Sequence, residues 1–281
     1  MAESGPYNHE LSERRDARQY PACLSVVVPV YNEAATLGEV VGKLLRVPCL
    51  LEVIIVDDCS TDGTAEAARQ LASAHGQVRV IHHERNSGKT AALRTGFALT
   101  TGDIVIVQDA DLEYDPADIF GVIEPILTGH ADVVFGSRFL VRRAARVLYF
   151  YHFLANKFLT FLSNALTNLN MTDVETGYKA FRGDIIRNMV IGSRGFGFEV
   201  EVAAKIAKLK VAIYEVPISY YGRTYAEGKK VMLSDGLLAI WLVIRFNLFC
   251  SLNASFRQLP DLKYKPNRLP IAVLESRERS E

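Results

Sequence analysis

The sequence predicts an α/β fold in which a mixed, mostly parallel sheet is flanked by helices, and three observations support this. From Leu24 to Ser137, apolar runs typical of buried strands alternate with segments whose apolar residues recur at helical spacing. The residues that follow most of these runs are polar, and in parallel α/β sheets such positions form the ligand-binding edge. The composition, 49% hydrophobic and 23% charged over 281 residues, fits one large globular domain with or without an appendage.

Five buried strands are predicted in this region, namely 24–30, 52–58, 78–82, 103–108 and 132–137. Between them, four helices are predicted. Leu37, Val40, Val41 and Leu44 form the apolar stripe of the first helix. The second runs through 65–75, with Asp62 or Thr64 as its cap and Gly76 ending it in a left-handed conformation. The third spans about 88–99, and the fourth opens at Pro116, with Asp115 before it as a cap.

Several protein classes are excluded by composition. Lys plus Arg and Asp plus Glu are both 32, so no overall field favours nucleic acid as a partner. The cysteines (Cys23, Cys49, Cys59 and Cys250) form no C-x-x-C pair and no histidine grouping, which disfavours a disulfide framework or a zinc site and favours a reducing cytoplasm. The polar residues 1–22 contain no signal peptide or membrane anchor and are expected to be a disordered arm.

Two nucleotide-binding motifs are also excluded. The stretch HERNSGKTAAL, residues 83–93, ends like a P-loop, but the position that requires the first glycine of that motif holds His83. No G-x-G-x-x-G follows the first strand, which argues against a dehydrogenase-type dinucleotide fold. The strand ends are acidic rather than glycine-rich.

Carboxylates follow the fourth strand. Asp109, Asp111 and Glu113 alternate along DADLE, which is expected to be extended, so their side chains can point to one side and converge. Three converging carboxylates require a cation, and hard oxygen ligands favour Mg²⁺ or Mn²⁺ completed by water and substrate phosphate. The alternative is a solvated acidic turn.

The ends of the first two strands contain the parts of a nucleobase pocket. Pro29 is rigid, Tyr31 offers a ring for stacking, and Glu33 and Asp58 can accept the ring N–H of a uracil or guanine. Each feature also has a simpler account, with Asn32 as a helix cap and Asp58 as a turn residue.

Taken together, these motifs resemble family 2 of the inverting glycosyltransferases, which have a GT-A fold, and among them the dolichol-phosphate mannose synthase type. The resemblance covers about Leu24 to Lys230, and the segments VPVYNE, VDDCSTDGT, NSGKTAALRTGF, QDADLEY and GSR occur in family order. The resemblance implies that the base and ribose pocket is lined by Pro29, Tyr31, Glu33, Val56 and Asp58. It also implies that the ribose and diphosphate are surrounded by Asp109, Ala110 and Asp111. The metal would be held by Asp111 and Glu113. Lys89 would supply a positive charge near the nucleotide. Many mannose synthases of this type carry glutamine at the position of Glu113.

Basic residues beyond the fifth strand suit an anionic acceptor. Arginine forks match phosphate geometry, and Arg138, directly after the strand, is expected to hold the acceptor phosphate, whereas Arg142, Arg143 and Arg146 can be surface charge. DVETGYKAFR resembles the family's D-x-x-x-G-x-[KR] region, with Asp173 near the acceptor or in a structural turn, and Glu199 and Glu201 begin a family helix. Arg223 and Lys229 match the arginine and lysine that close over the donor diphosphate in the resembled enzymes, on a loop bracketed by Gly222 and Gly228.

Two aromatic-rich segments, 146–170 and 232–256, are more apolar than a polar enzyme needs, but charged residues interrupt both. They are interpreted as interfacial helices, with buried core helices as the alternative. The expected domains are a catalytic domain at 23–230, including an apolar segment at 145–170, an amphipathic helix at 231–257 and a polar tail at 258–281.

The sequence therefore indicates a metal-dependent hexosyltransferase, peripheral on the cytoplasmic face of a membrane. It would move a hexose with inversion from a GDP- or UDP-linked nucleotide-diphospho-sugar to a polyprenyl or dolichyl phosphate. A separate membrane subunit is a possible partner. Two alternatives stay open: transfer to a hydroxyl of a glycan or small molecule, and sugar-nucleotide binding without turnover.

Overall fold

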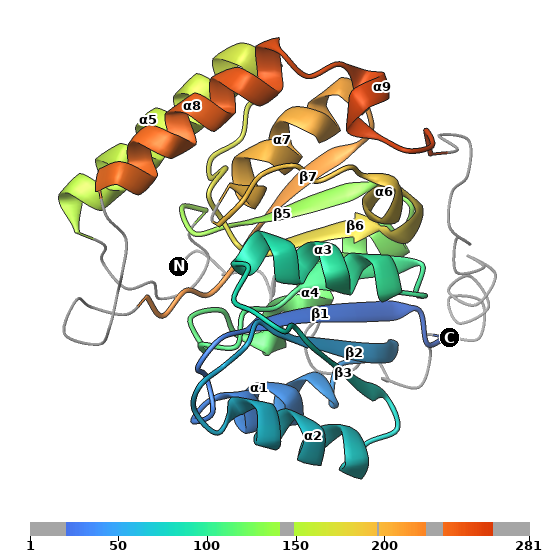
Figure 1. Ribbon diagram of the computed structural model, residues 1–281. Coiled ribbons are helices and arrows are strands. Elements are labelled where there is room, and N and C mark those ends of the chain that lie inside the picture. Colours follow the sequence, from blue (N-terminus) through green and yellow to red (C-terminus); the bar gives the residue numbers. More distant parts are fainter. Residues whose placement is uncertain (1–20, 141–148, 196, 223–232, 261–281) are drawn as a thin grey trace, which may run out of the picture.

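The computed structural model describes residues 21–140, 149–195, 197–222 and 233–260. Its centre is a seven-stranded sheet with the order β3-β2-β1-β4-β6-β5-β7 (Figure 1). Of these seven strands, β6 runs antiparallel to both of its neighbours and the other pairs are parallel. The strands are β1 Leu24–Val30, β2 Leu50–Asp57, β3 Val78–His82, β4 Ile104–Val107, β5 Val133–Ser137, β6 Lys179–Arg182 and β7 Ile213–Pro217.

Helices cover both faces of the sheet (Figure 1). One face carries α1 Leu37–Leu44, α2 Thr64–Ala74 and α4 Ile119–Leu127, which continues the short 3₁₀ turn η2 Pro116–Asp118. The other face carries α3 Lys89–Leu99, α6 Gly183–Asn188 and α7 Phe198–Leu209. Two long helices, α5 Phe150–Thr167 and α8 Leu233–Leu248, pack side by side and against α7, and α9 Leu252–Ser255 follows them.

Strand alternation produces these two core layers. In β1, Val26 and Val28 belong to the cluster under α1 and α4, whereas Val27 points to the cluster under α3 and α7. All three valines are fully buried. Burial on both faces is why the predicted strands are continuous apolar runs rather than alternating ones.

The α/β architecture and the five predicted strands are confirmed. Asp115 caps the next turn as expected, because its side chain accepts the Ala117 N–H. The expected left-handed end at Gly76 is wrong. Helix α2 ends at Ala74, and the chain leaves it through an extended His75 with φ −134° and ψ 109°, so no left-handed residue is needed.

The two apolar segments form α5 and α8, and both expose large side chains. On α5 the exposed stripe contains Tyr151, Leu154, Phe158 and Phe161; on α8 it contains Leu237, Leu238, Trp241 and Leu248. These positions recur at helical spacing, so each helix presents an apolar stripe. Within the described ranges, no helix is long and apolar enough to cross a membrane.

Candidate active site

The chain turns sharply at the carboxyl ends of four adjacent strands. A left-handed residue follows each of β1, β2, β3 and β4: Asn32 with φ 57°, Cys59 with φ 64°, Gly88 with φ 86° and Leu112 with φ 60°. A leucine in this region is strained, and such strain persists where the surroundings fix the backbone. The polar strand ends are therefore held in defined turns along one edge of the sheet.

The turns after β1 and β2 are joined by hydrogen bonds. The Asn32 side-chain oxygen accepts the Thr61 N–H at 2.8 Å, and the Glu33 N–H donates to the Thr64 hydroxyl at 2.8 Å. Asn32 thus fixes a turn between loops rather than capping a helix by itself. Glu33 also accepts from the Thr36 hydroxyl at 3.2 Å.

The other residues predicted for the base pocket lie close to these turns. Pro29 and Val56 are register partners on the paired strands β1 and β2, and Tyr31 is 44% exposed at the end of β1. The structure therefore brings Pro29, Tyr31 and Val56 to one edge, with the Tyr31 ring open to a ligand.

Asp58 is buried and holds the loop after β3. Its carboxylate accepts the Ser87 N–H at 3.0 Å and the Gly88 N–H at 2.6 Å, and it pairs with Nδ1 of His83 at 2.7 Å. This explains the NSG motif, because Gly88, the cap of α3, adopts φ 86° while its N–H meets the carboxylate. The segment that resembles a P-loop thus binds a carboxylate of the same chain.

Lys89 lies between two carboxylates. Its Nζ is 2.9 Å from Asp109 and 3.5 Å from Oε1 of Glu199. Burial alone would lower the pKa of Lys89, but the negative charges of Asp109 and Glu199 outweigh it and raise the pKa. Lys89, the first residue of α3, is therefore a cation held beside the end of β4 by Asp109 and is not a solvated surface lysine.

The expected convergence of Asp109, Asp111 and Glu113 is wrong. The segment is a tight turn with Leu112 left-handed, so alternation does not apply, and Asp109 turns to Lys89. No group of three or more His, Cys, Asp or Glu side chains that could hold a metal occurs among the described residues. Asp111 and Glu113 still share one turn, because the Glu113 N–H donates to Asp111 Oδ1 at 3.1 Å. Two hard carboxylates suit Mg²⁺ or Mn²⁺, which typically takes its other ligands from water and phosphate.

Tyr220, which the sequence analysis did not single out, connects this turn to Arg138. The Tyr220 hydroxyl donates to Oε2 of Glu113 at 2.8 Å. The Arg138 guanidinium carbon lies 5.3 Å from the centre of the same ring, within range of a cation–π contact. Burial, followed by the neighbouring Tyr114 and Glu113, raises the pKa of Tyr220, so the hydroxyl remains a donor. In the sequence, the only feature that could have drawn attention to Tyr220 is its position just before the segment that contains Arg223 and Lys229.

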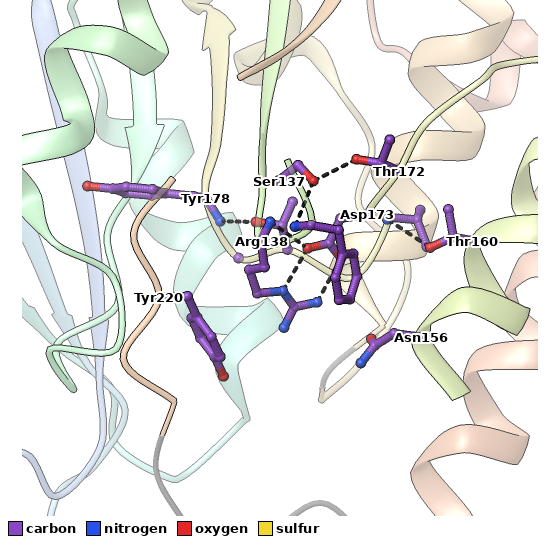
Figure 2. Close-up of polar contacts among 12 residues, drawn as sticks. Ser137, Arg138, Asn156, Thr160, Thr172, Asp173, Tyr178 and Tyr220 are labelled. Atoms are coloured by element: carbon purple, nitrogen blue, oxygen red, sulfur yellow. Dashed lines mark hydrogen bonds and ion pairs between the residues drawn. The ribbon is translucent and has the colours of Figure 1, made fainter. Parts of the chain in front are cut away.

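Arg138 is paired with Asp173, as Figure 2 shows. Arg138 Nε and Nη2 each lie 2.7 Å from a different Asp173 oxygen, and the Arg138 backbone N–H donates to the same carboxylate at 3.2 Å. Asp173 is fully buried, and the Arg138 side chain is 10% exposed. Burial opposes the charged form, but Asp173 outweighs it and raises the pKa of Arg138. The planar fork is therefore fixed in orientation.

The loop between Asp173 and β6 carries a second carboxylate, the half-buried Glu175, whose Oε1 atom is buried. Burial and the nearby charge of Glu199 raise the pKa of Glu175 to about 7. Lys179 lies next to it, and burial lowers the pKa of Lys179 to about 8. The Lys179 ammonium donates to the carbonyls of Val174 and Thr176, which fixes the loop.

Glu199 and Glu201 begin α7 as expected, and they have different surroundings. Glu201 accepts the N–H groups of Gly192 and Ser193 at 2.8 Å each and pairs with Lys205, which is a structural role. Glu199 faces Lys89. The remaining basic residues of interest, Arg142, Arg143, Arg146, Arg223 and Lys229, lie outside the described residues.

The first turn of α5 packs next to Arg138. Phe139, the next residue, packs edge-on against Phe153 of α5, with ring centres 5.4 Å apart. The ammonium of Lys157 lies 4.2 Å from the Phe139 ring centre and donates to the Thr172 carbonyl. The arginine and the start of the apolar helix are thus parts of one packed unit.

Comparison with known proteins identifies relatives over most of the chain. Residues 25–190 match the model of glycosyl transferase family 2. An undecaprenyl-phosphate mannosyltransferase of Micrococcus luteus is 31% identical over 234 residues, covering 79% of this chain and 93% of that protein. A dolichol-phosphate mannosyltransferase of Pyrococcus furiosus is also 31% identical, covering 73% of this chain and 58% of that protein.

Solved structures match the fold. Glucosyl-3-phosphoglycerate synthase from Mycobacterium tuberculosis, in complex with uridine diphosphate, superimposes with a TM-score of 0.62 at 23% identity and covers 80% of both chains. Another structure of that enzyme, with Mn²⁺, uridine diphosphate and phosphoglyceric acid, gives a TM-score of 0.60 at 23% identity, covering 80% of this chain and 77% of that one. At this identity the match concerns the fold alone.

Proposed function

Because the chain belongs to glycosyl transferase family 2, we propose that it is a glycosyltransferase that moves a hexose from a nucleotide-diphospho-sugar to a polyprenyl phosphate. The relatives named above are mannosyltransferases of undecaprenyl and dolichol phosphate, which supports this acceptor class. The donor is GDP- or UDP-linked. A hexose is the group transferred.

One observation carries the proposal: Tyr220 binds Glu113 with its hydroxyl and Arg138 with its ring. Glu113 belongs to the proposed donor and metal side, and Arg138 to the proposed acceptor side. Transfer between two phosphates needs the reacting groups to be held next to each other, and a shared tyrosine fixes that relation.

On the donor side, we assign the base and ribose to Pro29, Tyr31, Glu33, Val56 and Asp58, and the ribose and diphosphate to Asp109, Ala110 and Asp111. Tyr31 has the exposed ring that stacking requires. Asp58 contributes through the loop it holds, since its oxygens accept the Ser87 and Gly88 N–H groups. Lys89 forms an ion pair with Asp109 at 2.9 Å.

Asp111 and Glu113 are the proposed ligands of Mg²⁺ or Mn²⁺. A divalent cation bound there would neutralise charge on the departing nucleoside diphosphate. We assign Arg223 and Lys229, on the basis of the family resemblance alone, to the same diphosphate. Tyr220 supports the metal side through its hydrogen bond to Glu113.

On the acceptor side, Arg138 holds the phosphate. Asp173 engages two of the five guanidinium N–H groups, which leaves donors for a ligand in a fixed plane. A phosphate monoester has a second pKa near 6, so at neutral pH the acceptor is mostly a dianion and a competent nucleophile. No general base is required, and direct displacement inverts the anomeric configuration. Because Arg138 occupies the Asp173 carboxylate, that group is poorly placed to be the base that a hydroxyl acceptor would need.

The lipid acceptor requires access to a membrane, and α5 and α8 supply a surface for it. Their exposed aromatic residues and the exposed Arg245 suit a bilayer interface. Packing of Phe153 against Phe139 places the start of this surface next to Arg138. We propose peripheral attachment at the cytoplasmic face, either directly or with a separate membrane subunit.

The test is product identification. The purified full-length protein is incubated with Mg²⁺ or Mn²⁺, a panel of GDP- and UDP-sugars, and polyprenyl phosphates, and the lipids are analysed by mass. A polyprenyl phosphate gaining one hexose is the expected product. Tight nucleotide binding without any sugar transfer to any acceptor would contradict the proposal and indicate a non-catalytic binding protein.

A further inference from the structure

Two buried carboxylate oxygens have no hydrogen-bond partner in the described part of the chain: Oε1 of Glu175 and Oε2 of Glu199. Glu199 is 5% exposed and Glu175 is half-buried, and bulk solvent does not reach either oxygen. A buried acceptor without a donor is costly, and native proteins retain one where another molecule supplies the donor.

The two side chains come from different elements and interact electrostatically. Glu175 lies on the loop before β6, and Glu199 lies in the first turn of α7. Burial is the largest cause that raises the pKa of Glu175, and the negative charge of Glu199 is the next. The positive end of the α7 helix dipole favours a negative charge at Glu199. It does not explain why one oxygen of Glu199 lacks a hydrogen-bond donor.

Their position is between the two halves of the proposed site. Lys89 contacts both Asp109 and Glu199, which links Glu199 to the donor side. Glu175 follows Asp173, the partner of Arg138, by two residues, which links it to the acceptor side. The sugar that is transferred must pass between these two sides.

The loop around Glu175 is firmly held, so mobility does not explain the missing bond. The Gly177 N–H donates to the Tyr114 hydroxyl at 2.9 Å, and the Val174 N–H donates to the Thr160 hydroxyl at 3.2 Å. Glu215 accepts the Thr172 N–H at 2.9 Å.

The chemistry favours a ligand with neutral donors. Around this point, the carboxylates Asp109, Asp173, Glu175 and Glu199 face the cations Lys89, Arg138 and Lys179, so the charge is already nearly balanced. A metal ion would add excess positive charge. Hydroxyl groups donate hydrogen bonds without adding charge, and a hexose presents several of them.

We propose that Glu175 and Glu199 form the hexose-binding part of the donor site, where their unpartnered oxygens accept hydrogen bonds from sugar hydroxyl groups. This inference rests on the proposed function. It makes both residues determinants of which sugar is accepted, while the base and diphosphate are bound elsewhere.

The test compares binding of the sugar nucleotide with binding of the nucleotide alone. Calorimetry on the full-length protein uses GDP-mannose with GDP and UDP-glucose with UDP, and the pair in which the sugar adds affinity is kept. For Glu175→Gln and Glu199→Gln, affinity for the sugar nucleotide should fall roughly tenfold or more. Affinity for the nucleoside diphosphate should stay within about twofold for Glu175→Gln, which does not touch Lys89.

Glu201→Gln is the matched control, because it changes a buried carboxylate on the same helix that is fully partnered. It should lower the melting temperature without selectively weakening sugar binding. Sugar nucleotides that lack one hydroxyl group of the hexose then identify the hydroxyl that each glutamate binds. An analogue that lacks this hydroxyl should bind wild type more weakly than the intact sugar nucleotide does. Its affinity should not fall further in the corresponding Glu→Gln variant.

The inference would be overturned if Glu175→Gln lost equal affinity for the nucleotide and the sugar nucleotide, or if neither variant lost affinity for the sugar nucleotide. In both cases wild type would still transfer the hexose to lipid. If instead the proposed function is wrong, wild type will form no glycosylated lipid from any sugar nucleotide.

Discussion

Arg138 combines a structural ion pair with the proposed role of holding the acceptor phosphate. Its bidentate pair with Asp173 fixes the guanidinium plane, and Tyr220 covers one side of it. Leaving one member of a buried ion pair without its partner costs about 3–5 kcal/mol, so a single substitution changes both stability and activity. A second substitution is needed to separate the two effects.

We predict that Arg138→Gln lowers stability and abolishes transfer to lipid, whereas Arg138→Gln with Asp173→Asn regains most of the stability but no transfer. The amide pair removes the uncompensated buried charge without restoring a phosphate-binding cation. Thermal melts and lipid product assays measure the two effects. Nucleotide affinity should be unchanged in the double variant, and recovery of transfer there would remove Arg138 from the acceptor site.

Glu175 predicts a pH dependence of stability. The pKa of Glu175 is about 7 in the folded protein, against an ordinary value of 4.5 in the unfolded chain, so between these pH values the folded state binds more protons than the unfolded state. Stability therefore falls as pH rises from about 4.5 to 7. The groups that act on Glu175 are Glu199, Asp173, Lys179 and Arg138.

Melting curves of the ligand-free protein from pH 4.5 to 8 test this prediction. Glu175→Gln should remove part of the decline that wild type shows below pH 7. Lys179 does not confuse the result, because its lowered pKa of about 8 affects stability only above that value. Parallel curves for wild type and variant would show that Glu175 does not titrate in this range.

At the scale of elements, the sequence predicted the five longer or more apolar strands and missed β6 and β7. β6 contains only four residues, two of them the buried Lys179 and Arg182, so it lacks the apolar run on which prediction depends. Its antiparallel insertion between β4 and β5 brings the start of β6 to the site edge. The carboxylate convergence was predicted wrongly because the left-handed Leu112 breaks the extended geometry that alternation assumes.

Gly177 tests how closely the β6 loop approaches the donor side. A Cβ at this position would lie 2.8 Å from Asp109 Oδ2 and 3.0 Å from the Tyr114 ring. We predict that Gly177→Ala displaces Asp109 from Lys89, destabilises the protein by about 1–3 kcal/mol and weakens nucleotide binding. Gly121→Ala in α4, which meets nothing within 4 Å, should stabilise it by about 0.5–1 kcal/mol. Unchanged nucleotide affinity in Gly177→Ala would argue against a role for Asp109.

The exposed stripes of α5 and α8 predict membrane attachment. Replacing Tyr151, Phe158 and Phe161 together by serine should reduce recovery with anionic vesicles roughly tenfold or more, with little loss of stability, because these side chains are exposed. Tyr214→Ser is the control, since Tyr214 is an exposed aromatic residue on the edge strand β7 and belongs to neither stripe. Salt should weaken attachment. Unaltered flotation of the triple variant would exclude this surface.

For the molecule as a whole, the residues proposed to bind the nucleotide, the metal and the acceptor phosphate follow the carboxyl ends of the sheet strands. The turns after β1, β2 and β3 carry the residues proposed for the nucleotide, the turn after β4 carries those proposed for the metal, and Arg138 after β5 is followed by Phe139, which packs against Phe153 of α5. Motifs in the sequence predicted most of these positions because they lie next to strand ends. The contacts between them, above all Tyr220 and the loop of Glu175, join residues distant in sequence and needed the folded chain.

The metal assignment has a separate whole-protein test. Asp111→Asn should abolish metal-dependent transfer while leaving the melting temperature nearly unchanged, since it removes a charge in a turn outside the core. Chelator should stop wild-type turnover, and added Mg²⁺ or Mn²⁺ should restore it. Full activity in chelator would contradict the assignment of Asp111 and Glu113.

The central claim is that the acceptor phosphate itself is the nucleophile. The most direct measurement compares initial rates for a polyprenyl phosphate and the matching free polyprenol, with the same donor, between pH 5 and 8. We expect transfer to the phosphate alone, with a rate that falls below about pH 6 as the acceptor gains a proton. Faster transfer to the free polyprenol would contradict it and require a catalytic base for a hydroxyl acceptor.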